Sequence, residues 1–161
     1  MQQTTAVYLK ALNVLFIALV TAQVLFAVIA YILKATGSFP GNTELMGIFI
    51  YFVPALDMVC ILVAHLVSKK KLSLVDANNS LADKLNTYRA ISITRWAMIE
   101  GGTLFTIIAY LLTGAQMFLV MMILMILVFL TLSPTVKRIL KELPLSSEEQ
   151  EIMNDPDGLI G

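Results

Sequence analysis

The chain has 161 residues, of which 58% are apolar and 14% charged, and its 11 basic and 11 acidic side chains leave no net charge. A typical soluble domain is about 45–50% apolar and about 25% charged, and so small a soluble fold has too little interior to hide this much apolar surface. The composition therefore argues against a soluble enzyme, a nucleic-acid-binding protein and a disordered protein.

Four apolar segments follow one another along the chain. A bilayer core about 30 Å thick needs about 20 apolar residues in a helix. Segments of about this length cover Ala11–Leu33, Leu45–Val67, Ala90–Leu112 and Ala115–Leu132. We therefore predict an all-α fold, with a four-helix transmembrane bundle in residues 1–141 and an acidic cytoplasmic tail in residues 142–161.

Basic residues are unevenly distributed among the loops, and this bias sets the direction of membrane insertion. The loops after the first and third spans hold Lys34 alone. The other basic residues lie on the opposite side, at Lys10, Lys69, Lys70, Lys71, Lys84, Arg89, Arg95, Lys137, Arg138 and Lys141. We therefore predict a multi-pass protein of the cell inner (plasma) membrane with both termini in the cytoplasm.

Two capping-box patterns predict helix starts outside the apolar segments. Ser80 with Asp83 precedes apolar residues at helical spacing, so the third span is predicted as one long helix from about residue 81 to 112. Ser146 with Glu149 predicts one or two helical turns in the tail.

The tail ends in the apolar pair Leu159-Ile160. We expect the tail to be solvated because of its charge, while docking of its end on the inner loop or on a partner stays open. Its acidic residues, which lie on the same predicted side as the basic inner loop, are Glu142, Glu148, Glu149, Glu151, Asp155 and Asp157.

One segment is repeated. Leu25–Leu33 and Leu104–Leu112 are identical at six of nine positions, and both lie in the outward half of an odd-numbered span. The chain is therefore interpreted as two hairpins in the same orientation, a parallel repeat.

Polar side chains inside the spans are costly and by default mark functional positions. At 1.5 Å per helical residue, Gln23, Asp57 and Glu100 lie about 16–19 Å from the flanking basic residues, near the bilayer midplane. A second polar layer nearer the cytoplasm contains Asn13, His65 and Arg95.

The midplane cluster has two interpretations. In the functional one, Asp57 and Glu100 share a proton or bind a small cation, Gln23 completes the coordination, and His65 and Arg95 line a cytoplasmic route. In the structural one, protonated Asp57 and Glu100 hydrogen-bond across helices and hold the bundle together, while His65 and Arg95 anchor at the membrane interface. The sequence leaves both open.

Local features modify two of the helices. Pro54 removes a backbone donor and predicts a kink in the second span, one turn before Asp57. Gly101 and Gly102 predict a close approach by another helix, because they carry no side chains.

No P-loop, nucleotide fingerprint, His-Glu-x-x-His motif or Ser/His/Asp set occurs in the sequence. The lone Cys60 and the lone His65 are too few to build a zinc site. We therefore expect no catalytic residues, no metal and no cofactor.

The chain resembles small four-helix bacterial inner-membrane proteins of uncharacterised function. The residues that carry this resemblance are the stretch Arg95–Gly101, the repeated Leu-Phe-x-x-Ile-Ala-Tyr, and the Leu-Ser-Ser-Glu-Glu tail that ends in Asp-Pro-Asp. The resemblance implies a fold but no activity.

The duplicated hairpin and its mid-span acid also resemble, more weakly, the duplicated proteolipid of rotary ATPases. Leu56–Val63 lies where that family carries its ion-binding carboxylate, which implies a proton or sodium carrier. Ala97–Gly101 resembles the carboxylate motif but lies in the other helix of its hairpin. The chain departs from that family in having only 8 glycines and in the side on which its hairpin loops are predicted.

We expect an integral membrane protein without enzymatic activity, an accessory or assembly subunit of a membrane complex. Its partners are then the lipid bilayer and other membrane subunits or further copies of itself, and no nucleic acid. The alternative is a carrier or channel-type subunit that handles protons or sodium ions with the midplane carboxyls.

Overall fold

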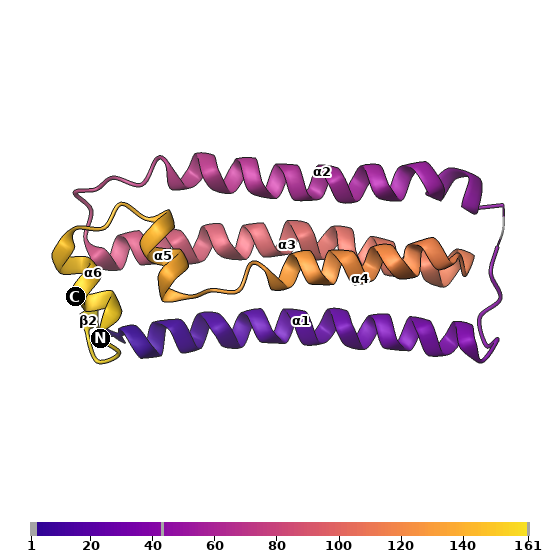
Figure 1. Cartoon of the computed structure of the whole chain (residues 1–161), viewed down its shortest axis with the longest axis horizontal. Coiled ribbons are helices and arrows are strands. Elements are labelled where there is room, and N and C mark those ends of the chain that lie inside the picture. Colours follow the sequence, from indigo (N-terminus) through magenta and orange to yellow (C-terminus); the bar gives the residue numbers. More distant parts are fainter. Residues whose placement is uncertain (1–2, 43, 161) are drawn as a thin grey trace. The chain divides into compact units, whose positions relative to one another are not determined.

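The structure, a computed structural model, describes residues 3–42 and 44–160. Six helices hold 77% of these residues, which confirms the all-α class. The elements are β1 (Gln3–Thr4), α1 (Thr5–Ala35), α2 (Met46–Leu72), α3 (Leu81–Thr113), α4 (Gln116–Leu130), α5 (Val136–Glu142), α6 (Ser147–Asn154) and β2 (Leu159–Ile160) (Figure 1).

Within the described ranges, α1, α2 and α3 are long and apolar enough to cross a membrane, as expected for the first three predicted spans. Helix α4 coincides with the fourth predicted span but has only 15 residues. At 1.5 Å per residue it is about 22 Å long, less than a bilayer core of about 30 Å. Helix α2 continues through Pro54 without interruption.

The chain forms two compact units, each built from segments distant in sequence. The first unit contains Met1–Ile17, His65–Arg95 and Ser133–Gly161. The second unit contains Ala18–Ala64 and Trp96–Leu132.

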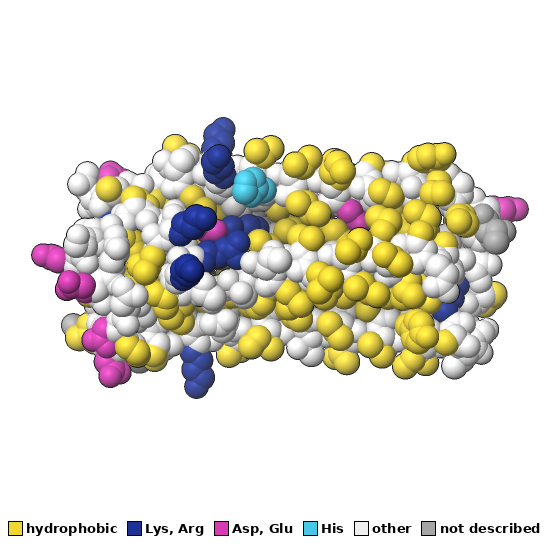
Figure 2. All heavy atoms as spheres, in the orientation of Figure 1, with side chains coloured by type: hydrophobic (Ala, Val, Ile, Leu, Met, Phe, Trp, Pro, Cys, Tyr) yellow, Lys and Arg dark blue, Asp and Glu magenta, His cyan; other side chains and the backbone are white. Residues whose placement is uncertain are grey.

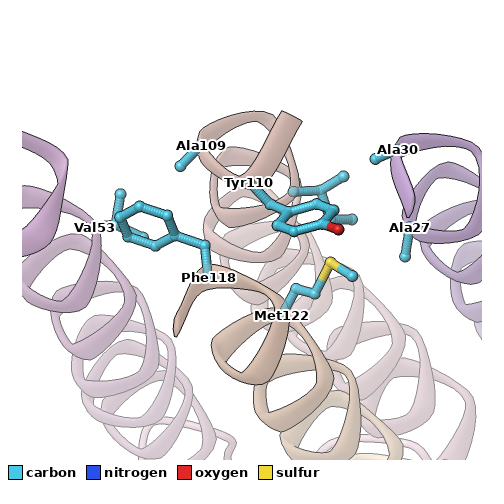
Figure 3. Close-up of a cluster of buried hydrophobic side chains, with 8 residues drawn as sticks. Ala27, Ala30, Val53, Ala109, Tyr110, Phe118 and Met122 are labelled. Carbon is cyan, nitrogen blue, oxygen red and sulfur yellow. The ribbon is translucent and has the colours of Figure 1, made fainter. Parts of the chain in front are cut away.

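The core of the second unit is a cluster of buried side chains from four helices (Figure 3). Phe118 of α4 points toward Val53 of α2, while Tyr110 of α3 points toward the side of α1 that carries Ala27 and Ala30. The small alanine side chains allow the large aromatic rings to fill the space between helices, which maximises the close packing that holds helices together in lipid.

A tight turn joins α3 to α4 in the second unit. Gly114 has φ +72°, a left-handed conformation that favours glycine. The loop after α1 lies against this turn, because the N–H of Asn42 donates to the carbonyl of Leu112 at 2.8 Å. A Cβ on Gly41 would lie 2.5 Å from the carbonyl oxygen of Thr113, so the close approach requires glycine.

The first unit joins the two ends of the chain. Strand β1 pairs antiparallel with β2, with Gln3 opposite Ile160. The hydroxyl of Thr5 donates to the carbonyl of Ile152 at 3.0 Å. Met153 and Ile160 are only 1% and 5% exposed, so the tail docks through its apolar residues, which the expectation of a solvated tail did not include. Its acidic residues Glu148, Glu151, Asp155 and Asp157 are exposed, in line with that expectation. The tail folds back because its apolar residues gain more from burial than its acidic residues lose, and those acids stay at the surface or pair with basic groups.

The N-terminal part of α3 provides the surface that the chain ends cover in the first unit. The Ser80 hydroxyl accepts from the N–H of Asp83 at 3.2 Å, so the predicted cap is present. Leu85 and Tyr88 are each 1% exposed, and the hydroxyl of Tyr8 donates to the Leu85 carbonyl at 2.8 Å. The prediction of one long helix from about residue 81 is confirmed.

Large apolar side chains remain exposed on the outside of the second unit. In α2, Tyr51 is 79% exposed, and Ile48 and Met58 are also largely exposed. Figure 2 shows hydrophobic side chains spread along the helices of this unit, with few charged side chains among them. Exposed apolar surface of this extent is stable only when lipid or another protein covers it.

The two copies of the repeated segment have different environments in the second unit. Ala27 and Ala30 of the first copy occupy the positions of Thr106 and Ala109 in the second, and all four are buried. Tyr31, however, is half exposed, whereas the equivalent Tyr110 is buried in the core. Helix α3 therefore buries a wider face than α1.

Candidate functional site

A hydrogen bond joins α2 to α3 inside the second unit. The hydroxyl of Thr106 donates to Oδ2 of Asp57 at 2.7 Å. Asp57 is 5% exposed and Thr106 is fully buried. A hydrogen bond to a charged or polar group shielded from water is stronger than one at a surface, so this contact fixes the two helices relative to each other.

Gly102 allows the close approach that this hydrogen bond needs. A Cβ at Gly102 would lie 3.0 Å from Oδ1 of Asp57, 3.1 Å from Cε of Met125 and 3.4 Å from Cβ of Cys60. A Cβ at Gly101 would meet nothing within 4 Å. Of the predicted glycine pair, therefore, Gly102 faces the neighbouring helices and Gly101 does not.

Two polar groups beside the core are buried without hydrogen bonds. Within the described residues, Oδ1 of Asp57 has no partner, and neither Oε1 nor Nε2 of Gln23 has one. Gln23 is fully buried. Each unpaired buried polar group costs about 1–3 kcal/mol, so these atoms destabilise the second unit unless another group compensates them.

The helical register places these groups in one layer. Ala27 and Val53 belong to the same core cluster, and α1 and α2 run in opposite directions within the second unit (Figure 1). Gln23 lies one turn before Ala27, and Asp57 lies one turn after Val53. Residues four apart lie on the same helix face, so Gln23 and Asp57 lie on inward faces at the same level.

Helix α3 adds two hydroxyl groups to this layer. Thr103 and Thr106 lie one turn before Ile107 and Tyr110, which are both in the core cluster. Thr103 is fully buried, and its hydroxyl donates to the carbonyl of Ile99 at 2.9 Å. We call Gln23, Asp57, Thr103 and Thr106 the polar layer.

Glu100 lies on a different face of α3. It is two residues before Gly102, so about 200° separates the two positions around the helix, and Gly102 is the one that faces Asp57. Glu100 is half-buried. Among the described residues, no hydrogen bond or ion pair joins it to Asp57 or Gln23.

The predicted cytoplasmic layer does not come together as one cluster of contacts in the first unit. Asn13 donates to the carbonyl of Leu9 in its own helix at 3.0 Å. His65 is exposed. Arg95 is buried and pairs with Glu142 of the tail instead.

Arg95 and Arg138 share the carboxylate of Glu142 in the first unit. Arg95 donates from both terminal nitrogens at 3.1 and 3.2 Å, and Nε of Arg138 donates at 3.0 Å. Burial alone favours the neutral carboxyl, but the hydrogen bonds and charges of the two guanidinium groups outweigh it and lower the pKa of Glu142.

A second ion pair joins the tail to α3. The ammonium of Lys84 lies 2.8 Å from both carboxylate oxygens of Glu149. Glu149 also completes the capping box of α6 with Ser146, so the predicted tail helix is confirmed. Burial favours the neutral acid, yet Lys84 and the Ser146 amide outweigh it and lower the pKa of Glu149.

No group of three or more His, Cys, Asp or Glu side chains lies close enough to hold a metal ion in residues 3–42 and 44–160. The oxygen atoms of the polar layer are the ligands that could contact a small ion, because they belong to one carboxylate, one amide and two hydroxyl groups.

Thr106 is the important residue of the polar layer that sequence analysis missed. A threonine in a helix usually bonds the carbonyl one turn earlier, as Thr103 does, so its type gives no sign of an interhelical contact. The available signal was its position four residues after Gly102, which puts it on the face that a neighbouring helix approaches.

No protein-family model, curated protein or solved structure matches this chain.

Proposed function

We propose that this chain is an integral membrane protein of the cell inner membrane that crosses the bilayer four times, with both ends in the cytoplasm. The observation that supports this most is the pairing of β1 with β2, which holds the two ends of the chain together. A chain whose ends lie on one side of a membrane crosses it an even number of times. Three crossings are incompatible with that pairing.

Helix α4 then makes the fourth crossing, despite its 15 residues. A short apolar helix spans a bilayer at modest cost when the bilayer thins locally. The distribution of basic residues supports the cytoplasmic side for the paired ends, since Lys84, Arg95 and Arg138 all lie in the first unit with them. The resemblance to small four-helix inner-membrane proteins agrees with this topology.

We further propose a non-enzymatic role as an accessory or assembly subunit. Two ion pairs of the first unit hold the C-terminal tail on α3, and the hydrogen bond between Asp57 and Thr106 joins α2 to α3. The apolar outer face of α2 supports a membrane partner, because it exposes Tyr51 and Met58, which are large side chains.

Native-mass analysis after purification in a mild detergent tests this role. An accessory subunit elutes in a complex with at least one different membrane protein at fixed stoichiometry. The variant Tyr51→Ala is expected to weaken that complex, whereas Ser38→Ala, at an exposed loop position, is the matched control. Recovery of the chain alone or only with copies of itself contradicts the accessory role.

A further inference from the structure

Five exposed lysines of the first unit take no part in its ion pairs. The two acidic residues in those pairs, Glu142 and Glu149, bind other basic side chains. Among the described residues, no ion pair or hydrogen bond uses the side chains of the remaining lysines of α2 and α5. We call these lysines the lysine patch: Lys69, Lys70, Lys71, Lys137 and Lys141. Their positive charges are available to a partner from outside the chain.

The packing of α5 turns two of these lysines outward. Ile139 is fully buried, and Lys137 and Lys141, two residues to either side of it, lie on nearly the opposite side of the helix. Both lysines are exposed. Glu142, the last residue of α5, is held by two guanidinium groups, so the helix cannot turn about its axis without breaking these contacts. The two lysines are therefore fixed on the outer face of α5.

The other three lysines of the patch lie in the last turn of α2. Figure 2 shows Lys and Arg side chains gathered over the end of α2 and over α5, whereas most of the acidic side chains visible in the first unit lie farther toward the left end of the picture. The charges of this unit are therefore separated, and the patch presents a positive surface that its own acidic residues do not neutralise.

An apolar side chain adjoins the patch on α2. Leu66 is 61% exposed, and it lies one turn before Lys69 and Lys70, on the same side of the helix. A partner that suits this surface carries a negative charge next to an apolar chain. An anionic phospholipid has both, because its phosphate group joins a charged headgroup to acyl chains.

The proposed topology places the patch at the depth of the lipid headgroups. Lys69 directly follows the apolar part of α2, while α4 ends at Leu130 and α5 begins at Val136. With four crossings and cytoplasmic ends, α2 and α4 both reach the cytoplasmic surface at these points. Lysine side chains near the ends of spans extend to the headgroups, and anionic lipids of the cytoplasmic leaflet attract clusters of them.

We propose that the lysine patch binds the headgroups of anionic phospholipids, with Leu66 against an acyl chain. The ammonium groups donate to the phosphate oxygens, and α5 lies at the membrane surface with its two lysines toward the lipid. This inference rests on the proposed topology, which brings the patch to the membrane, and it adds a lipid preference to the accessory role.

Native mass spectrometry of the full-length protein tests the patch, in a mild detergent with equal amounts of phosphatidylglycerol and phosphatidylcholine that carry the same acyl chains. Both lipids have a phosphate group, but only phosphatidylglycerol has a net negative charge. We expect the wild type to bind phosphatidylglycerol preferentially. The double variant Lys137→Gln with Lys141→Gln is expected to weaken that binding at least fivefold, because each lysine near the surface contributes about a factor of five.

Lys34→Gln, which removes a lysine from the second unit, is the matched control and should keep the preference. The patch lysines are exposed, so an unchanged unfolding midpoint is expected for the double variant and shows that it folds. Inorganic phosphate at the same concentration should not displace phosphatidylglycerol, because it has no acyl chain to lie against Leu66. Displacement would show a site for free phosphate and overturn the proposal.

Three other results would also overturn it. One is equal binding of the two lipids by the wild type, as expected if an acidic protein or a second copy of the chain covers the patch. The others are a phosphatidylglycerol preference that survives replacement of all five lysines by glutamine, and an equal loss of binding in Lys34→Gln. Cysteine accessibility measures the number of crossings independently. Confirmed crossings together with equal binding of the two lipids would overturn the lipid surface alone.

Discussion

The ammonium of Lys84 lies 2.8 Å from the carboxylate of Glu149, and only 1% of the lysine side chain is exposed. The two residues are 65 positions apart, yet their contact joins the start of α3 to the tail helix α6. A buried ammonium that loses its partner is strongly destabilising. The tail therefore cannot leave α3 without a large cost, and it is a structural part of the first unit.

Breaking this ion pair should loosen the tail. Glu149→Gln leaves the buried ammonium of Lys84 without a negative charge beside it, and we expect a loss of about 3 kcal/mol, at the lower end for buried pairs because Glu149 is partly exposed. Faster hydrogen exchange in residues 147–160 would measure it. Glu148→Gln, at an exposed neighbour, should have no effect. Equal hydrogen-exchange rates in the Glu148→Gln and Glu149→Gln variants would show that the ion pair contributes nothing to the stability of the tail.

Acidification should release the tail through the same carboxylates. The pKa values of Glu142 and Glu149 are lowered below the ordinary value of 4.5, so the folded chain binds these protons less readily than the unfolded chain. Their stabilisation is complete above the ordinary pKa and is lost as the pH falls through the folded values.

We therefore expect the contribution of Glu142, measured as the difference in unfolding midpoint between wild type and Glu142→Gln in detergent, to stay level from pH 7 to about 5 and to shrink below that. The unfolding midpoint of Glu142→Gln is expected to be lower than that of the wild type at pH 7, because Arg95 loses its charged partner. It is also expected to change less as the pH falls. An identical acid dependence in wild type and Glu142→Gln would rule out this carboxylate as a cause.

The hydrogen bond between Thr106 and Asp57 should contribute more to the free energy of unfolding than the hydrogen bond of a threonine within its own helix. Thr106→Val removes the donor and leaves both carboxyl oxygens of Asp57 unpaired, with an expected loss of about 1–3 kcal/mol. Thr106→Ser should restore most of it. Thr94→Ala is the control, because in the described part of the chain the Thr94 hydroxyl donates to the carbonyl of Ala90 in its own helix. Thermal unfolding in detergent compares the stability of these three variants. Equal losses of stability in Thr94→Ala and Thr106→Val would contradict an interhelical role for Thr106.

The neighbouring glycines of α3 should respond in opposite directions to alanine. Gly102→Ala forces its methyl against Oδ1 of Asp57 and the methyl of Met125, and such overpacking costs about 1–3 kcal/mol. The methyl group that Gly101→Ala adds has no neighbouring atom to clash with. This variant should gain up to about 1 kcal/mol in the free energy of unfolding, because alanine has the better helix propensity. Measured unfolding free energies that rank Gly102→Ala as the more stable variant would show that α2 does not approach α3 here.

Local patterns in the sequence predicted the helices well, because caps and apolar runs act over a few residues. Ser80 and Ser146 marked the starts of α3 and α6. Docking of Ile160 was left open, and its pairing with Gln3 was not predicted, because Gln3 lies at the opposite end of the chain. Charge composition favoured a solvated tail, but single contacts such as the one between Arg95 and Glu142 decide where an acidic residue goes.

The polar layer was predicted in part. Depth along the helices selected Gln23 and Asp57, which the register places at one level. Depth alone does not give the direction in which a side chain points, so Glu100 was grouped with them although it lies on another face from Gly102. The direction of a side chain also depends on the rotation of its residue around the helix axis. For α3, the position of Gly102 against Asp57 fixes that rotation.

The most direct test of the central claim, an even number of crossings with joined ends, is the accessibility of single cysteines. In a Cys60→Ala background, Gln3→Cys, Asn79→Cys, Ser147→Cys and Ser38→Cys are treated with a membrane-impermeant maleimide in spheroplasts. The account predicts that Ser38→Cys alone is labelled from outside, and that the other three are labelled only after permeabilisation. Labelling of Gln3→Cys and Ser147→Cys from opposite sides of the membrane would contradict it.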